Sequence, residues 1–493
     1  MAAARLPDDP DLGQLRKQAK DLRDLARAGA PGALALVAEH HPRGEHAVSL
    51  AGAQLVVARH YGFASWSRLK HHVEVITEYR RSPDEVTATA DPASEFLRLA
   101  CLRYGGDDSP DRWRDARRLL AAHPGLPRAS IHVAAAACDQ KAAGDLLRRD
   151  PGLASRQGGP YRWEPLLYLA YARHDPEVTA DAALGTARLL LGHGADPDAG
   201  YLWHGMPPPF TVLTGVLGSG EGGDLNQPEH PHAMALASLL LDSGADPNDG
   251  QALYNRQFGD DDRHLELLLR HGLGRGDGGP WRARLGSAQD SPGEMTRQLL
   301  WWAIVHDQRA RVRLLVANGT DFTSPYAGRG LFAGRTPAEV AAMCGHSDVL
   351  RYLLAQGAAP PQLPGPDALV AACLRADRPE VQRLSGHLAE ARARRPGLIA
   401  WAAASGKHAA IPLLAGLGWD VNALGRTDGP TEQPWETALH YAAGEGDTAL
   451  ASLLLSLGAD PAIHDARFDS TPLGWARHFG QQDTITLLTP LTP

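Results

Sequence analysis

A short pattern that returns along the chain constrains its fold more than any other feature of the sequence. Three segments share a run of leucines that leads into Gly-Ala-Asp-Pro, at 189–197, 239–247 and 453–461. In each copy an apolar helix face ends, glycine supplies the left-handed backbone conformation that closes a helix, and proline prevents further helix. Looser copies end at Gly272, Gly319, Gly357 and Gly418. The pattern predicts a series of helices that all end in the same way.

A second pattern marks the residues where helices begin. Thr336, Thr437 and Thr471 each precede a run of small and apolar residues, and proline follows directly at 337 and 472. A threonine hydroxyl can cap the first turn, and proline at the first helical position loses no hydrogen bond because that N–H has no partner inside the helix. Thr437 and Thr471 lie 34 residues apart, which is the spacing of a repeated helix pair.

These residues resemble the ankyrin repeat. Residues 435–465 hold its whole pattern: a Thr-Ala-Leu-His start that includes His440, a first helix of small residues, a second helix that ends at Leu455, and Gly-Ala-Asp-Pro. Elsewhere the chain keeps the helix pairs and loses parts of the pattern. Counting paired helices predicts about ten units between Ile131 and Leu488, several of them degenerate. The resemblance implies an all-α ankyrin-repeat solenoid in which each helix pair stacks on its neighbours.

The repeats are unevenly spaced, which predicts insertions. The longest lie at 200–210, 274–292, 321–335 and 420–435, and each follows a predicted second helix. In a solenoid such insertions collect in loops on one face. We therefore expect long finger loops to project from the array.

The chain before the array has a different pattern. Asp11 caps a predicted helix, and a further cap at Ser65 begins another that contains Trp66. Segments 15–20 and 58–66 resemble the leader of many uncharacterised bacterial ankyrin-repeat proteins. We predict a helical N-terminal module at 1–81, a helical linker or N-terminal cap at 82–130, and the ankyrin-repeat array at 131–493.

Charge is mild over the whole chain and changes sign in the module. The 493 residues carry a net charge of −8, but residues 12–81 hold eleven Lys or Arg and six Asp or Glu, a net +5. This leaves open an alternative in which the module binds nucleic acid through phosphates. Because basic and acidic residues alternate along the first helix, a solvated surface with paired charges is favoured.

The sequence supplies little catalytic chemistry, and we expect no catalytic, cofactor-binding or metal-binding residues. Four cysteines stand far apart, and the His-His pairs at 40 and 71 point about 100° apart on a helix, so neither pair can chelate. The alternative of an enzyme is kept, with a site between finger insertions that includes His204, Asp260 or His306. No apolar run approaches the roughly 20 residues that span a bilayer.

Aromatic residues gather in the predicted fingers, although the chain has only 6% aromatic residues. Rigid aromatic rings dominate binding surfaces, but rings in a long loop can also pack inward and hold the loop in place. The candidate partner-binding residues are Trp163, Tyr201, Trp203, Phe210, Trp281, Phe322, Tyr326 and Trp435. The sequence thus predicts a cytoplasmic, monomeric bacterial protein without enzyme activity, a scaffold that binds another protein through its fingers and concave face.

Overall fold

The computed structural model describes residues 4, 6–7, 9–42, 44, 49–328, 330–425 and 434–492. The chain divides into two compact units, Met1–Met295 and Thr296–Pro493. Each is described by itself below. Half of the predicted insertion at 420–435, residues 426–433, lies outside the described residues.

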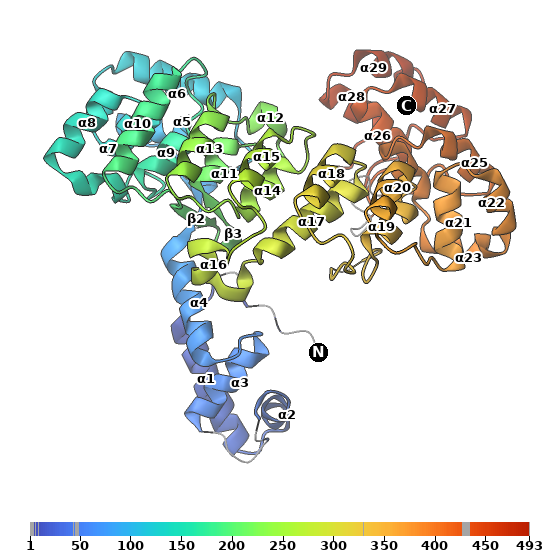
Figure 1. The fold of residues 1–493 in the computed structure, drawn as a ribbon, viewed down its shortest axis with the longest axis horizontal. Helices are drawn as coiled ribbons and strands as arrows, with labels where there is room; N and C mark the ends of the chain where they lie inside the picture. The colour runs from blue at the N-terminus through green and yellow to red at the C-terminus, as the bar shows by residue number, and fades with distance from the viewer. Residues whose placement is uncertain are drawn as a thin grey trace. The chain divides into compact units, whose positions relative to one another are not determined.

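The first unit begins with a small helical module. Its described helices are α1 (Leu12–Arg27), α2 (Pro31–His40), α3 (Leu50–His60) and α4 (Trp66–Tyr79) (Figure 1). The carboxylate of Asp11 accepts a hydrogen bond from Gln14 N, and the hydroxyl of Ser65 accepts one from Arg68 N, so both predicted caps are confirmed. Leu15, Val56 and Leu69 from three of the helices meet in one apolar cluster. Helix α2 was missed because its sequence lacks a side-chain cap.

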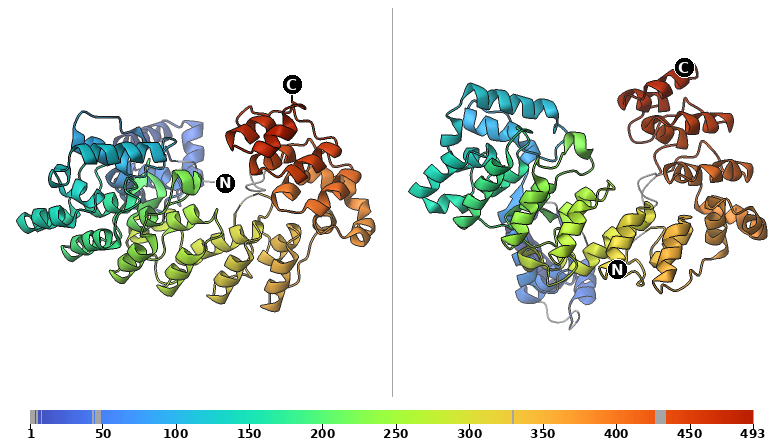
Figure 2. Two further views of the ribbon diagram at one scale, coloured as in Figure 1. Left: turned by 90° about the horizontal axis from the view of Figure 1, so that it is seen from above. Right: turned by 45° about the horizontal axis from the view of Figure 1, so that its top comes forward.

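Helix pairs follow the module in this unit. Their first helices are α5 (Pro92–Ala100), α7 (Ile131–Ala136), α9 (Pro165–Tyr171), α11 (Val212–Leu217) and α14 (Gly250–Arg256). Their second helices are α6 (Pro110–Ala122), α8 (Gln140–Arg149), α10 (Ala180–Gly192), α13 (Ala233–Asp242) and α15 (Arg263–Arg270). Two shorter helices are α12 (Gly223–Asn226) and α16 (Gly279–Leu285), and the latter lies where the sequence predicted a finger loop. First helices contact first helices along the row, and from α8 onward second helices contact second helices (Figure 2).

The second unit continues the same arrangement. Helix α17 (Pro292–Val305) crosses the boundary between the units, and α18 (Arg309–Ala317) follows it. The pairs after it are α19 (Pro337–Met343) with α20 (Ser347–Ala355), α21 (Gly365–Leu374) with α22 (Arg378–Arg383), α24 (Leu398–Ala404) with α25 (Ile411–Gly416), α26 (Ala438–Glu445) with α27 (Thr448–Ser456), and α28 (Pro472–His478) with α29 (Gln482–Leu488). An extra helix, α23 (Leu388–Arg394), packs against α21. Here too α24, α26 and α28 contact one another in turn.

The predicted helix ends are confirmed at the three closest copies of the pattern. Gly194, Gly244 and Gly458 have φ angles of 91°, 101° and 93°. A residue with a side chain enters this left-handed region reluctantly, which is why the pattern keeps glycine there.

A small sheet departs from the predicted all-α fold. Strands β2 (Gly200–Trp203) and β3 (Met206–Thr211) form an antiparallel hairpin from the predicted finger at 200–210. Strand β1 (Arg80–Arg81), directly after α4, pairs with β2 in parallel, with Arg80 opposite Leu202. The pairing joins segments far apart in the sequence, so local sequence patterns cannot predict it. Helices nevertheless make up most of the described chain.

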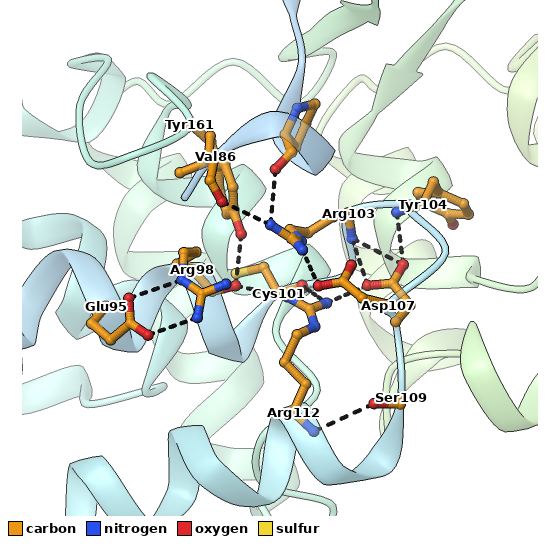
Figure 3. A network of polar contacts seen from close by, with 12 residues as sticks. Val86, Glu95, Arg98, Cys101, Arg103, Tyr104, Asp107, Ser109, Arg112 and Tyr161 are labelled. Carbon is orange, nitrogen blue, oxygen red and sulfur yellow. Dashed lines mark hydrogen bonds and ion pairs between the residues drawn. The ribbon is translucent and has the colours of Figure 1, made fainter. Parts of the chain in front are cut away.

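A buried polar network fastens the segment after β1 to the first helix pair (Figure 3). The Arg103 guanidinium donates to the carbonyls of Pro83 and Val86, at 3.3 and 3.1 Å, and also pairs with Asp107. Asp108 accepts from the backbone N–H of Arg103 and Tyr104 and forms a buried ion pair with Arg112. Burial raises the pKa of Asp108, and the adjacent Arg112 opposes that rise.

Removing one partner of this buried pair is expected to destabilise the first unit. In Asp108→Ala the Arg112 guanidinium stays buried without its carboxylate, which costs about 3–5 kcal/mol. The matched control is Asp111→Ala, because Asp111 pairs with Arg114 on the surface and its side chain is 82% exposed; exposed pairs contribute less than about 1 kcal/mol. Denaturant-induced unfolding of the full chain measures both, and equal costs would contradict the assignment.

Candidate interaction surface

The aromatic residues predicted in the fingers of the first unit pack inward. Trp163, Tyr201 and Phe210 are 1%, 1% and 8% exposed. Tyr201 stacks between the other two rings, with centroid distances of 5.0 Å to Trp163 and 5.6 Å to Phe210. These rings form the core that holds the hairpin against α9, so they offer little surface to another molecule. Their burial supports the packing interpretation, and a binding role for them stays a prediction.

Trp281 contacts the end of the N-terminal module, and Trp203 fastens the hairpin to the loop after α5. Trp281 is 5% exposed, lies 4.9 Å from the ring of Tyr79 at the end of α4, and donates from Nε1 to the carbonyl of Asp198. The half-buried Trp203 donates from Nε1 to the carbonyl of Arg103 at 3.3 Å. Both indoles therefore have structural partners in the first unit.

His204, a candidate in the enzyme alternative, contributes to the same attachment. Its Nε2 lies 2.9 Å from Asp84 Oδ1, and its Nδ1 lies 3.2 Å from Ser82 Oγ. Asp260 lies just before α15, and His306 stacks on Trp302 in the second unit with a centroid distance of 3.8 Å. No observation brings these three residues into one site.

Two half-buried carboxyls, Glu164 and Asp198, lie beside this attachment. Burial raises the pKa of Glu164 to about 7, the negative charge of Asp196 adds to the rise, and Arg284 opposes it. Burial also raises the pKa of Asp198 to about 6. Both groups therefore change charge close to neutral pH, inside the part of the fold that holds the hairpin.

The predicted aromatic residues of the finger after α18 are partly accessible. Phe322 and Tyr326 are half-buried, and Tyr326 stacks on Trp301 with a centroid distance of 4.6 Å and an interplanar angle of 12°. The backbone N–H of Tyr326 donates to the carbonyl of Arg335, which closes the loop. One face of the Tyr326 ring is therefore occupied within the unit.

A group of rings in the last two helix pairs is open to solvent. We call Trp435, Phe468, Trp475 and Phe479 the C-terminal aromatic surface. Phe468 and Phe479 are 62% and 56% exposed, whereas the two tryptophans are half-buried. Trp475 lies at the centre, with centroid distances of 5.2 Å to Trp435, 6.3 Å to Phe468 and 6.1 Å to Phe479.

A cation lies over two of these rings. The guanidinium carbon of Arg467 is 5.6 Å from the centroid of Trp435 and 5.4 Å from that of Phe468. Such contacts stabilise the arrangement by about 0.5–1 kcal/mol at an exposed site. The surface thus combines apolar area with one fixed positive charge.

Asp465 holds the loop that carries Phe468. Its carboxylate accepts hydrogen bonds from the backbone N–H of Arg467, at 2.9 Å, and of Ser470, at 3.1 Å, and from Trp475 Nε1 at 3.0 Å. Burial raises the pKa of Asp465, but these bonds and the one from Phe468 N favour the charged form and hold the pKa below its ordinary value. One buried carboxylate therefore fixes the loop and the central indole together.

His440 ties the same loop to the preceding pair. Its Nδ1 accepts from the backbone N–H of Thr437, so Nε2–H donates to the carbonyl of Ser470 at 3.0 Å. Burial lowers the pKa of His440, which favours the neutral ring that this pattern requires. A side chain at Gly444 would place its Cβ 3.1 Å from the ring of Trp475. The glycine therefore lets the indole approach α26 closely.

Sequence reasoning named Trp435 of this surface and missed the other three rings. Trp475 follows a threonine cap and was assigned to an ordinary first helix, and Phe479 comes directly after that helix. A first helix of small residues that carries one large ring at an exposed position is the signal that could have found them.

A metal site, a reactive thiol and a membrane span each place a requirement on the described residues. In the ranges given above, no group of three or more His, Cys, Asp or Glu side chains is placed to hold a metal ion. All four cysteines are free and buried, and burial raises the pKa of Cys101, Cys138 and Cys344 to about 12, so these thiols stay protonated at neutral pH. Among the described helices, none is both long and apolar enough to cross a bilayer.

Stacked helix pairs with glycine-closed second helices define a helical-repeat protein. The family model described as the ankyrin repeat matches residues 333–364 and 435–466. The first match covers α19 and α20, and the second covers α26, α27 and the loop up to Asp465. The chain therefore contains ankyrin repeats at these two places, as the sequence patterns predicted. No curated protein gives a sequence match to it.

Replacing Glu164 by glutamine is expected to remove a pH-dependent weakness of the first unit. A carboxyl whose pKa is raised by folding is neutral in both states below its unfolded value of about 4.3. As the pH rises from about 4.3 to about 7, the unfolded state releases this proton while the folded state keeps it, so stability is lost over this window and the loss is complete once the folded carboxyl is also charged. Glu164→Gln should therefore match the wild type near pH 4 and melt at a higher temperature at pH 8.

Thermal unfolding at pH 4, 6 and 8 measures the effect. The control is Glu177→Gln, since Glu177 is exposed in the loop before α10. A difference between wild type and Glu164→Gln that stays constant with pH would contradict the assignment.

Proposed function

We propose that this protein is a scaffold without enzyme activity that binds another protein through the C-terminal aromatic surface. The observation that carries the proposal is the exposure of Phe468 and Phe479 beside two half-buried tryptophans. Contiguous exposed rings are uncommon on a monomer, and clustered aromatic residues dominate binding energy. The ankyrin match at 435–466 includes Trp435 of this surface and ends just before Phe468, and ankyrin repeats generally mediate protein–protein interaction.

We further propose that the helix pairs between Ile131 and Leu488 form a single array of about ten ankyrin-type units, and that residues 1–81 are a separate module. Support comes from the repeated contacts of first helices with first helices in each unit. Because each pair is buried by its neighbours, loops and exposed helix faces can vary without loss of the core. We expect the protein to act as a cytoplasmic monomer.

The charges of the N-terminal module favour this function over nucleic-acid binding. Arg23 lies 2.8 Å from Asp24, and Lys70 lies 3.3 Å from Glu74 in an i,i+4 pair. A cation beside a carboxylate is a poorer partner for phosphate than an isolated one.

The test is affinity capture with matched variants. The full chain, the double variant Phe468→Ser/Phe479→Ser and the control Leu354→Ser are each used as bait in a lysate of the native organism. Leu354 is exposed on α20, away from the surface. We expect at least one captured protein to be lost from the double variant and retained by the control. The same set of proteins on all three baits would contradict the proposal.

A further inference from the structure

The C-terminal aromatic surface includes an exposed positive charge, which favours a negatively charged partner. Arg467 is exposed, and its guanidinium lies over the rings of Trp435 and Phe468. The acidic residues closest to it in sequence are engaged elsewhere, because Asp469 pairs with His464 at 3.0 Å and Asp465 accepts bonds from the backbone and from Trp475. Among the residues that the structure describes, no carboxylate forms an ion pair with Arg467, so within that part of the chain the guanidinium edge is open to a carboxylate from outside.

The loop that carries Arg467 and Phe468, and the central indole of Trp475, are held in place before anything binds. Asp465 holds the backbone of Arg467 and the indole of Trp475, and His440 holds Ser470 in the same loop. A preformed site loses little conformational freedom on binding. An arginine in fixed geometry also forms stronger hydrogen bonds with a carboxylate than neutral donors do.

Further positive charge lies beside the exposed edge. Arg477 and His478 are exposed in the last turn of α28, and the His478 ring lies 4.8 Å from that of Phe479. Opposite charges are also present, since Asp469 is exposed and Glu445 is exposed at the end of α26. A ligand with a few separated negative charges fits this mixture better than one with a negative charge at every position.

We propose that the C-terminal aromatic surface binds an acidic segment of another protein in which an Asp or Glu side chain lies next to a large apolar or aromatic residue. This inference rests on the proposed function and names the partner's chemistry. Arg467 receives the carboxylate, while Phe468, Trp475 and Phe479 receive the apolar side chain. A single-stranded nucleic acid would also offer stacking and negative charge. It is disfavoured because its continuous phosphate backbone would meet Asp469 and Glu445.

The experiment uses a random phage-displayed peptide library selected on the full chain. Enriched peptides are synthesised and measured against the wild type, Arg467→Glu, Phe468→Ser/Phe479→Ser, and a control, Arg313→Glu. Arg313 is matched in chemistry, because its guanidinium carbon lies 5.7 Å from the ring centroid of Tyr352 elsewhere in the second unit. Arg467 is exposed, so its substitution leaves the core intact; circular dichroism confirms folding of each variant.

The expected result is enrichment of peptides with Asp or Glu beside Phe, Trp or Leu. Their affinity should fall about tenfold or more on Arg467→Glu, a factor that corresponds to about 1.4 kcal/mol. It should fall by a similar factor when the peptide acid is changed to its amide, and stay unchanged on Arg313→Glu.

Three outcomes would overturn the inference, and they separate it from the proposed function. Peptides that need Phe468 and Phe479 but bind Arg467→Glu normally would contradict the acidic partner, while the proposed scaffold function would still hold. Peptides that bind all variants equally, or no enrichment of any peptide on the wild-type chain, would contradict both the inference and the proposed binding surface. If an oligothymidylate probe bound the wild type but not Arg467→Glu, the partner of this surface would be a single-stranded nucleic acid and not a peptide.

Discussion

Burial of one helix pair by the next is the interaction on which the whole structure depends. Every residue of α7 and α9 is buried, and each helix contacts first helices of the neighbouring pairs as well as its own second helix. Small residues make this possible: α7 contains three alanines and α24 four, so consecutive first helices can approach closely. A single pair would expose most of its apolar surface, and only the stack removes that surface from water.

Stacking leaves the loops free, and the chain uses them in two opposite ways. In the first unit the hairpin of β2 and β3 turns its rings inward, where Tyr201 packs between Trp163 and Phe210, and β2 pairs with β1. In the second unit the loop around Asp465 turns Phe468 outward and fixes it there. Inward rings stabilise a long insertion, while outward rings kept in place by hydrogen bonds cost stability unless another molecule covers them. This contrast is the basis of the proposed function.

The sequence predicted features that depend on neighbouring residues along the chain. Threonine caps, glycine ends and the helix pairs follow from local geometry, and the structure confirms them at Thr336, Thr471 and Gly458. The sheet could not be predicted, because β1 and β2 are separated by more than a hundred residues. Strand β1 also consists of two arginines, which form no recognisable strand pattern. Whether each aromatic ring packs inward or faces solvent could not be predicted from the sequence either. Trp203 and Trp435 both lie among glycines and prolines, yet one bonds to Arg103 and the other joins an open surface.

The central claim is that rings at the C-terminal end of the repeats are open to solvent while those of the first-unit hairpin are not. Hydroxyl-radical footprinting of the full chain, read out by mass spectrometry, measures this directly for each side chain. The account predicts rapid oxidation of Phe468 and Phe479 and slow oxidation of Trp163, Tyr201 and Phe210. Protection of Phe468 and Phe479 equal to that of the hairpin rings would contradict it.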